Sequence, residues 1–112
     1  MSGNLRPLDS VVRDKMENAF EAKFEEIRVD PSSGEASRLG VRSFSRGNTL
    51  YFAPGLYSPE SQAGQQLIGH ELTHVVQRRQ GRVATDDPLL DSEAELCGKM
   101  VAAGAKAPVK CP

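Results

Sequence analysis

One segment constrains this chain more than any other: residues 69–76, which read Gly-His-Glu-Leu-Thr-His-Val-Val. His70 and His74 stand four positions apart, so on an α-helix they project from neighbouring turns of one face. The apolar side chains around them fall largely on the opposite side of the same helix: Ile68, Leu72, Val75 and Val76. We therefore predict a helix that packs on a core with one face and presents two imidazoles on the other.

Two histidines at this spacing, with a glutamate directly after the first, are typical of a zinc-binding helix. Catalytic zinc takes three protein ligands and leaves a fourth position open to water. Glu71 would lie about 100° around the helix from His70 and would act as the general base that takes a proton from that water. Such short patterns also occur by chance, so an ordinary helical domain without a metal is the alternative interpretation.

Composition restricts the classes of protein to be considered. A length of 112 residues fits one small domain, which we expect to span 7–104 with flexible termini at 1–6 and 105–112. The net charge of −1 with interspersed signs argues against nucleic-acid binding. The chain has no apolar run long enough to span a membrane and no signal-peptide pattern. Two cysteines make no disulfide framework, so we expect reduced thiols, with Cys97 buried and Cys111 in the tail.

The remaining patterns predict an α+β domain. Before the histidines we expect a helix over 9–27 capped by Asp9, a short strand at 27–29, a short helix over 34–39 between Ser33 and Gly40, and a β-hairpin of strands 41–45 and 49–52. The histidine helix should begin at Ser58-Pro59 and end near Gln80, and a last helix should begin at Asp87-Pro88 and end near Gly104.

A third ligand must come from elsewhere, because the chain has no third histidine. The last helix offers Asp91, Glu93 and Glu95, and Cys97 is a further donor. Glu93 lies at the centre of the apolar arc on a helical wheel, where an unpaired carboxylate would be costly. We therefore predict Glu93 as the ligand, with Asp91 as the rival if the helix phase differs, and Glu95 as a hydrogen-bond partner of a zinc-bound histidine. The alternative is that Glu93 pairs with Arg42 or another buried base.

A combination of residues carries a family resemblance over about 7–80. The segment His70–His74, the eighteen residues 75–92 and then Glu93 resemble the gluzincin pattern of metallopeptidases. The other matching positions are Pro7-Leu8, Ile27-Arg28-Val29, Ala36 to Gly40, Phe44, Gly47, Leu50-Tyr51-Phe52, Pro54-Gly55, Tyr57, Pro59, Gly64 and Leu67 to Gln77. With these, the chain is similar to the core domain of extracellular contractile injection system proteins.

The resemblance implies a small zincin-like α+β domain with Zn²⁺ as cofactor and a peptide or protein as substrate. It implies a metallopeptidase linked to contractile injection particles, as an effector or a particle-linked component. The protein would be made in the bacterial cytoplasm and exported through such a particle. Domains of this kind carry a downstream acidic stretch, which stands here as Asp91–Glu95, and in related zinc peptidases the first acid of such a run is a ligand.

Two departures leave the activity open. A gluzincin adds a histidine, tyrosine or arginine that stabilises the oxyanion, and the visible candidates here are Tyr51, Tyr57, Arg42 and Arg46. The chain also lacks the second lobe that walls the cleft of larger zincins. The alternative function is a non-catalytic module that docks cargo to the particle, with a metal that only joins two helices.

Overall fold

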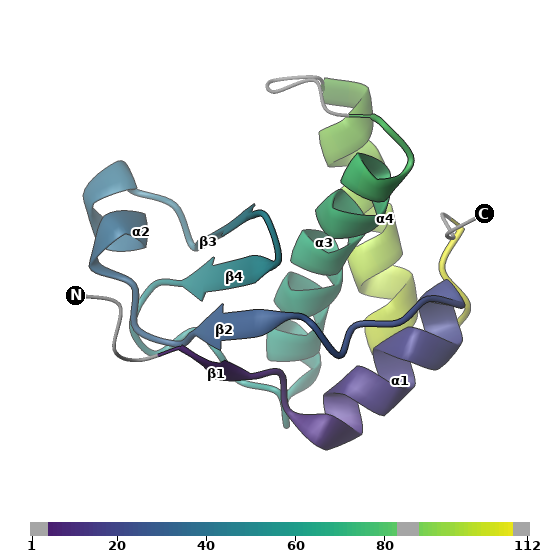
Figure 1. Cartoon of the computed structure of the whole chain (residues 1–112), viewed down its shortest axis with the longest axis horizontal. Coiled ribbons are helices and arrows are strands. Elements are labelled where there is room, and N and C mark those ends of the chain that lie inside the picture. The colour runs from purple at the N-terminus through teal and green to yellow at the C-terminus, as the bar shows by residue number, and fades with distance from the viewer. Residues whose placement is uncertain (1–4, 83–87, 109–112) are drawn as a thin grey trace.

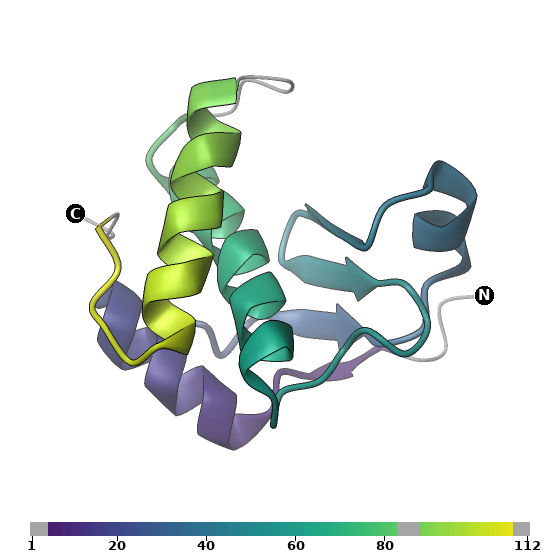
Figure 2. The same ribbon diagram turned by 180° about the vertical axis from the view of Figure 1, so that it is seen from behind.

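The computed structural model describes residues 5–82 and 88–108. Its elements follow in the order β1 (Arg6–Pro7), α1 (Ser10–Phe20), β2 (Arg28–Asp30), α2 (Gly34–Leu39), β3 (Ser43–Arg46), β4 (Thr49–Phe52), α3 (Gln62–Arg79) and α4 (Pro88–Ala102). Figure 1 shows the sheet and α2 on one side of α3, and α4 on the other. Figure 2, from behind, shows α4 lying along α3. Within the described residues the fold is therefore α+β, as predicted, with the histidine helix between the sheet and α4.

The sheet is small and mixed. Its strand order is β1-β2-β4-β3, with β2 and β4 parallel and the other neighbours antiparallel. The predicted hairpin is confirmed, although its first strand covers 43–46 rather than 41–45. Strand β3 pairs with β4 in a register that sets Phe44 opposite Tyr51, and Gly47 in the turn has a φ of 60° that favours glycine. This order leaves β3 at one edge of the sheet, next to α3.

The first helix is shorter than predicted. Asp9 caps it as expected, with its Oδ2 accepting from the backbone N–H of Val12 at 3.1 Å. The helix ends at Phe20 because Glu21 adopts a left-handed φ of 53°. Phe24, the next residue of the apolar repeat, is fully buried although it lies in a loop. The four-residue spacing of the apolar side chains therefore predicted core residues correctly, but it did not predict where the helix ends.

The histidine helix begins three residues later than predicted. Ser61, rather than Ser58, is the N-cap, and its Oγ accepts from the N–H of Gly64 at 3.0 Å. Ser58 instead lies in a preceding turn that folds back over the helix start. A Cβ at Gly64 would lie 1.8 Å from the backbone oxygen of Ser58, so only glycine permits this return.

Helices α3 and α4 approach each other at a contact between two glycines. A Cβ added to Gly98 would lie 2.5 Å from the backbone oxygen of Gln66, and one added to Gly69 would lie 2.6 Å from Val101 Cγ2. The helix backbones are therefore close enough for short side chains of α4 to reach the histidines of α3.

Two residues just outside the predicted span 7–104 make backbone contacts with the rest of the domain. At one end Arg6 pairs with Val29 in the sheet. At the other, Ala107 is 1% exposed, and its N–H donates to the backbone oxygen of Ala19 at 2.8 Å. Cys97 is buried, as predicted, whereas Cys111 lies outside the described residues. Among the described residues, no helix is both long and apolar enough to span a membrane.

Candidate metal centre

The polar face of α3 carries the two histidines, as the helical periodicity predicts. The side chains of His70 and His74 are 15% and 25% exposed, and their rings meet edge to face with centroids 4.9 Å apart. The apolar residues behind them are buried, namely Ile68, Leu72, Val75 and Val76. The apolar face of α3 is thus packed in the core, and the face that carries the histidines is partly exposed to solvent.

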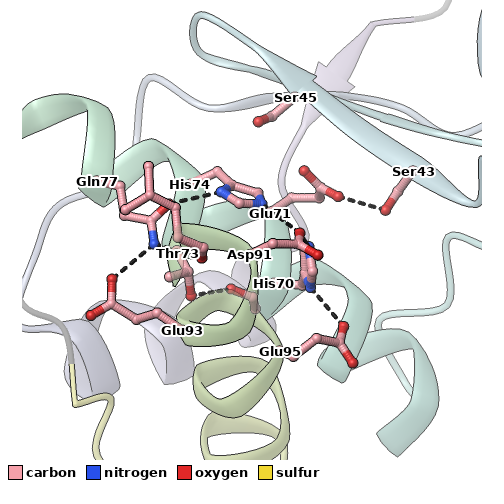
Figure 3. A network of polar contacts seen from close by, with 12 residues as sticks. Ser43, Ser45, His70, Glu71, Thr73, His74, Gln77, Asp91, Glu93 and Glu95 are labelled. Atoms are coloured by element: carbon pink, nitrogen blue, oxygen red, sulfur yellow. Dashed lines mark hydrogen bonds and ion pairs between the residues drawn. The ribbon is translucent and has the colours of Figure 1, made fainter. Parts of the chain in front are cut away.

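Asp91 of α4 lies between the two rings (Figure 3). Its Oδ1 is 3.4 Å from His70 Nε2 and 3.7 Å from His74 Nε2. A tetrahedral zinc ion with bonds of about 2.0–2.2 Å holds its ligand atoms about 3.3–3.6 Å apart. One donor atom from each of the three residues lies within 4.8 Å of the other two. These three donors are therefore placed where they could hold a metal ion.

The far side of each ring is also held. His70 Nδ1 lies 2.8 Å from Glu95 Oε1, and His74 Nδ1 lies 2.8 Å from Gln77 Oε1. An ionised carboxylate only accepts hydrogen bonds, so the Nδ1 of His70 is the donor to Glu95. Glu95 therefore hydrogen-bonds one of the two histidines, and its role as the partner of a metal ligand stays a prediction.

Glu93 points away from the histidines. Its Oε1 accepts from Gln77 Nε2 at 2.8 Å and pairs with Arg82 Nη2 at 2.9 Å. Contrary to the prediction, Glu93 does not lie at the centre of the buried arc of α4, because Leu89 and Leu96 are 76% and 53% exposed. The buried arc is formed by Leu90, Ala94, Cys97, Gly98, Val101 and Ala102.

The buried arc of α4 is thus turned around the helix axis relative to the prediction. This difference changes which acid of α4 faces the histidines. Glu93 and Asp91 lie on opposite flanks of the arc, roughly 160° apart around the helix. The flank of Asp91 faces the histidines, and the flank of Glu93 faces Gln77 and Arg82. The structure thus brings the rival residue to the two imidazoles.

Glu71 is buried on the side of α3 that faces the sheet. It is 3% exposed, and its Oε2 accepts from Ser43 Oγ of β3 at 2.7 Å (Figure 3). Arg78, on the same helix, donates to Ser45 Oγ at 3.1 Å and to the backbone oxygen of Gly47 at 2.8 Å. Burial lowers the pKa of the Arg78 guanidinium, and the negative charge of Glu71 opposes that shift. Helix α3 is therefore joined to the edge strand through polar contacts.

The four residues considered for oxyanion stabilisation have contacts elsewhere or lie exposed. The Tyr57 hydroxyl accepts from the N–H of Asp9 at 3.1 Å, and burial raises the pKa of that phenol. Arg46 pairs with Glu35, Tyr51 stacks on Phe44 with centroids 4.6 Å apart, and Arg42 is exposed. The described contacts give none of the four a place beside the imidazoles.

Sequence reasoning missed Ser43 and the role of Gln77. Gln77 shares the polar face of α3 with both histidines, three positions after His74, and this spacing was its only signal. Ser43 carries no signal in the sequence, because its contact with Glu71 depends on how the hairpin packs against α3.

Comparison with known proteins adds the family. No curated protein and no solved structure matches this chain. The model of the eCIS core domain matches residues 7–82, which include α1 to α3, β2 to β4 and the second residue of β1, and end before α4. This match covers more than half of the chain and confirms the resemblance to that domain, whereas the resemblance to gluzincin peptidases stays a prediction. The chain therefore belongs to the eCIS core domain family, whose name ties it to contractile injection systems.

Proposed function

We propose that the domain binds one Zn²⁺ through His70, His74 and Asp91 and hydrolyses peptide bonds. The observation that supports this most is the convergence of His70 Nε2, His74 Nε2 and Asp91 Oδ1 from two helices. Because Glu95 holds a hydrogen on the Nδ1 of His70, a neutral ring directs its Nε2 lone pair at the Asp91 carboxylate. Electron-rich atoms facing one another in this way are stabilised by a cation between them.

Each residue of the proposed site would have a separate role in peptide hydrolysis. Zinc bound here would polarise a water and the carbonyl of a peptide bond. Glu71 would take the proton of the water and pass it to the leaving amine. The Ser43 hydroxyl holds one carboxylate oxygen of Glu71 at 2.7 Å, which fixes the direction in which the other oxygen points.

The substrate in this proposal is a peptide in extended conformation. Strand β3 is the edge of the sheet and contacts Glu71 through Ser43. The edge of a sheet has unpaired backbone groups that bind an extended chain by adding a strand. Through its family, the domain would act with components of a contractile injection particle, as an effector or a particle-linked component.

Metal analysis and proteolysis of the full chain test this proposal. We expect one zinc per chain, lost in His70→Ala and retained in Glu71→Gln. We expect the wild-type chain to cleave an unfolded protein such as reduced casein, and Glu71→Gln to cleave it at less than about a hundredth of that rate. Zinc binding without cleavage would leave the non-catalytic docking module, and absence of zinc binding would reject the site.

A chelator separates a catalytic ion from one that only joins the helices. A catalytic site should lose zinc and keep most of its folded structure, whereas a structural zinc contributes its binding free energy to folding. We expect the melting temperature of the chelated chain to fall by no more than the mass-action effect of losing a ligand. Complete unfolding on chelation would favour the structural role.

A further inference from the structure

Gln77 is a buried amide at the junction of α3 and α4. Its side chain is 1% exposed and makes three hydrogen bonds. Its Oε1 lies 2.8 Å from His74 Nδ1, and its Nε2 donates to the backbone oxygen of Leu90 at 2.9 Å and to Glu93 Oε1 at 2.8 Å. Figure 3 shows the amide between the ring of His74 and the carboxylate of Glu93.

The two partners on α4 fix which way the amide faces. A backbone carbonyl and an ionised carboxylate can only accept, so the group that faces both must be the NH₂. Turning the amide over would bring its oxygen against two acceptors and lose two buried hydrogen bonds, each at a cost of roughly 1–3 kcal/mol. The oxygen of Gln77 must therefore face His74, and the Nδ1 of His74 must carry the hydrogen.

We propose that Gln77 is a positioning residue that holds His74 in the Nδ1–H tautomer, so that its Nε2 lone pair points at Asp91 and His70. This inference rests on the proposed metal site for its consequence, but the tautomer itself exists without the metal. The amide also ties the orientation of the ring to α4, because both of its donor contacts are on that helix.

The contact explains why this position holds an amide rather than an acid. Glutamate would accept equally well from His74, but its carboxylate would face Glu93 and the Leu90 oxygen with no hydrogen to donate. Glu95 performs the corresponding task for His70 as a carboxylate because it is 48% exposed and has no second acid among its described contacts.

The test measures the tautomer and the zinc affinity in Gln77→Leu, with Gln65→Leu as the matched control. Gln65 lies on the same helix and also bridges two elements, accepting from Lys15 and donating to the Pro59 oxygen. Ring ¹⁵N spectra of the metal-free full chain, at a pH where the imidazoles are neutral, report which nitrogen carries the hydrogen. Competition with a chromophoric chelator reports zinc affinity.

We expect the Nδ1–H form of His74 in the wild-type chain and in Gln65→Leu, and a mixture of both tautomers in Gln77→Leu. We expect the zinc affinity of Gln77→Leu to fall by about 10- to 100-fold, the range found when partners of metal ligands are removed. The exchanged pair Gln77→Glu with Glu93→Gln restores an acceptor facing His74 and a donor facing that acceptor. It should recover most of the Nδ1–H form but only part of the affinity, because the Leu90 oxygen still lacks its donor.

Each outcome is decisive. A wild-type ring in the Nε2–H form would overturn the assignment, and this measurement needs no variant to fold. An unchanged zinc affinity in a folded Gln77→Leu chain would overturn the positioning role. A wild-type chain with the Nδ1–H form but no affinity for zinc would support the tautomer and reject the proposed function, so the two failures are distinguishable.

Discussion

The two helices of the candidate centre differ in how they relate to the family. Helix α3 lies wholly inside the matched segment 7–82 and contributes His70, Glu71 and His74. Helix α4 lies beyond it and contributes Asp91, with Glu95 beside it. The matched segment therefore covers His70, Glu71 and His74 of the candidate centre but neither Asp91 nor Glu95. The family match by itself therefore assigns no third donor to the candidate centre.

The largest expected effect is on zinc affinity, when the acids on the two flanks of α4 are replaced one at a time. Asp91→Asn and Glu93→Gln each remove one negative charge at nearly constant size. We expect Asp91→Asn to lower zinc affinity by more than about 100-fold, because removing a direct ligand should exceed the 10- to 100-fold cost of removing its neighbours. Glu93→Gln keeps an acceptor for Gln77 and should change affinity by less than about 10-fold.

Equilibrium dialysis against labelled zinc measures both. A larger loss of zinc affinity in Glu93→Gln than in Asp91→Asn would favour Glu93 as the ligand, as the sequence predicted. It would contradict the assignment of the metal to the Asp91 side of α4.

The next effect concerns the contact that joins the two helices. Gly98→Ala places a methyl group against the Gln66 backbone oxygen and should lower the free energy of unfolding by about 1–3 kcal/mol, as overpacking does. The displaced α4 should also bind zinc more weakly. Urea denaturation measures the stability. Gly34→Ala is the control, because a Cβ there meets only the end of Arg38 at 3.7 Å and should be nearly neutral. An unchanged stability in Gly98→Ala would show that the helices separate easily.

A smaller effect should follow from the contact between α3 and the edge strand. Ser43→Ala removes the hydroxyl that holds Glu71 and should reduce the peptide cleavage rate by about 3- to 10-fold, equivalent to one hydrogen bond. Zinc affinity should stay constant. Ser45→Ala, two residues along the same strand, loses only a contact with Arg78 and should retain the wild-type rate. Equal rates in both variants would mean that Glu71 needs no support from the sheet.

The smallest effect should come from the ion pair between α2 and the hairpin. Arg46 Nη2 and Glu35 Oε2 are 2.9 Å apart, and this hydrogen bond lowers the pKa of the Glu35 carboxyl. Any stabilisation is present at neutral pH and is lost as the pH falls through that lowered pKa. Because the pair is exposed to solvent, we expect Glu35→Gln to leave the melting temperature within experimental error at pH 7. A clear drop would show that the hairpin is coupled to the core through this pair.

Sequence patterns were sufficient where local chemistry determines structure. The caps Asp9 and Ser33 and the Gly47 turn of the hairpin act within a few residues, so the pattern alone revealed them. The amphipathic face of α3 was equally visible, because a single helix carries the whole pattern.

Prediction was weaker where the answer depends on contacts distant in sequence. On the helical wheel of α4, Leu89 and Leu96 were predicted to be core residues. The packing of α4 against α3 instead buries the face that carries Ala94 and Gly98. Such a rotation decides between Glu93 and Asp91, although both are acids on the same helix. The contact of Ser43 with Glu71 spans 28 positions and left no trace in either segment.

The supports of the two imidazoles differ in their access to solvent, and this has a kinetic consequence. Gln77 is buried where α3 meets α4, whereas the Glu95 side chain on α4 is 48% exposed. Water competes for Glu95 but not for Gln77. If the proposed site holds zinc, ion exchange would then proceed by release of the His70 ring first, while the His74 ring keeps its orientation.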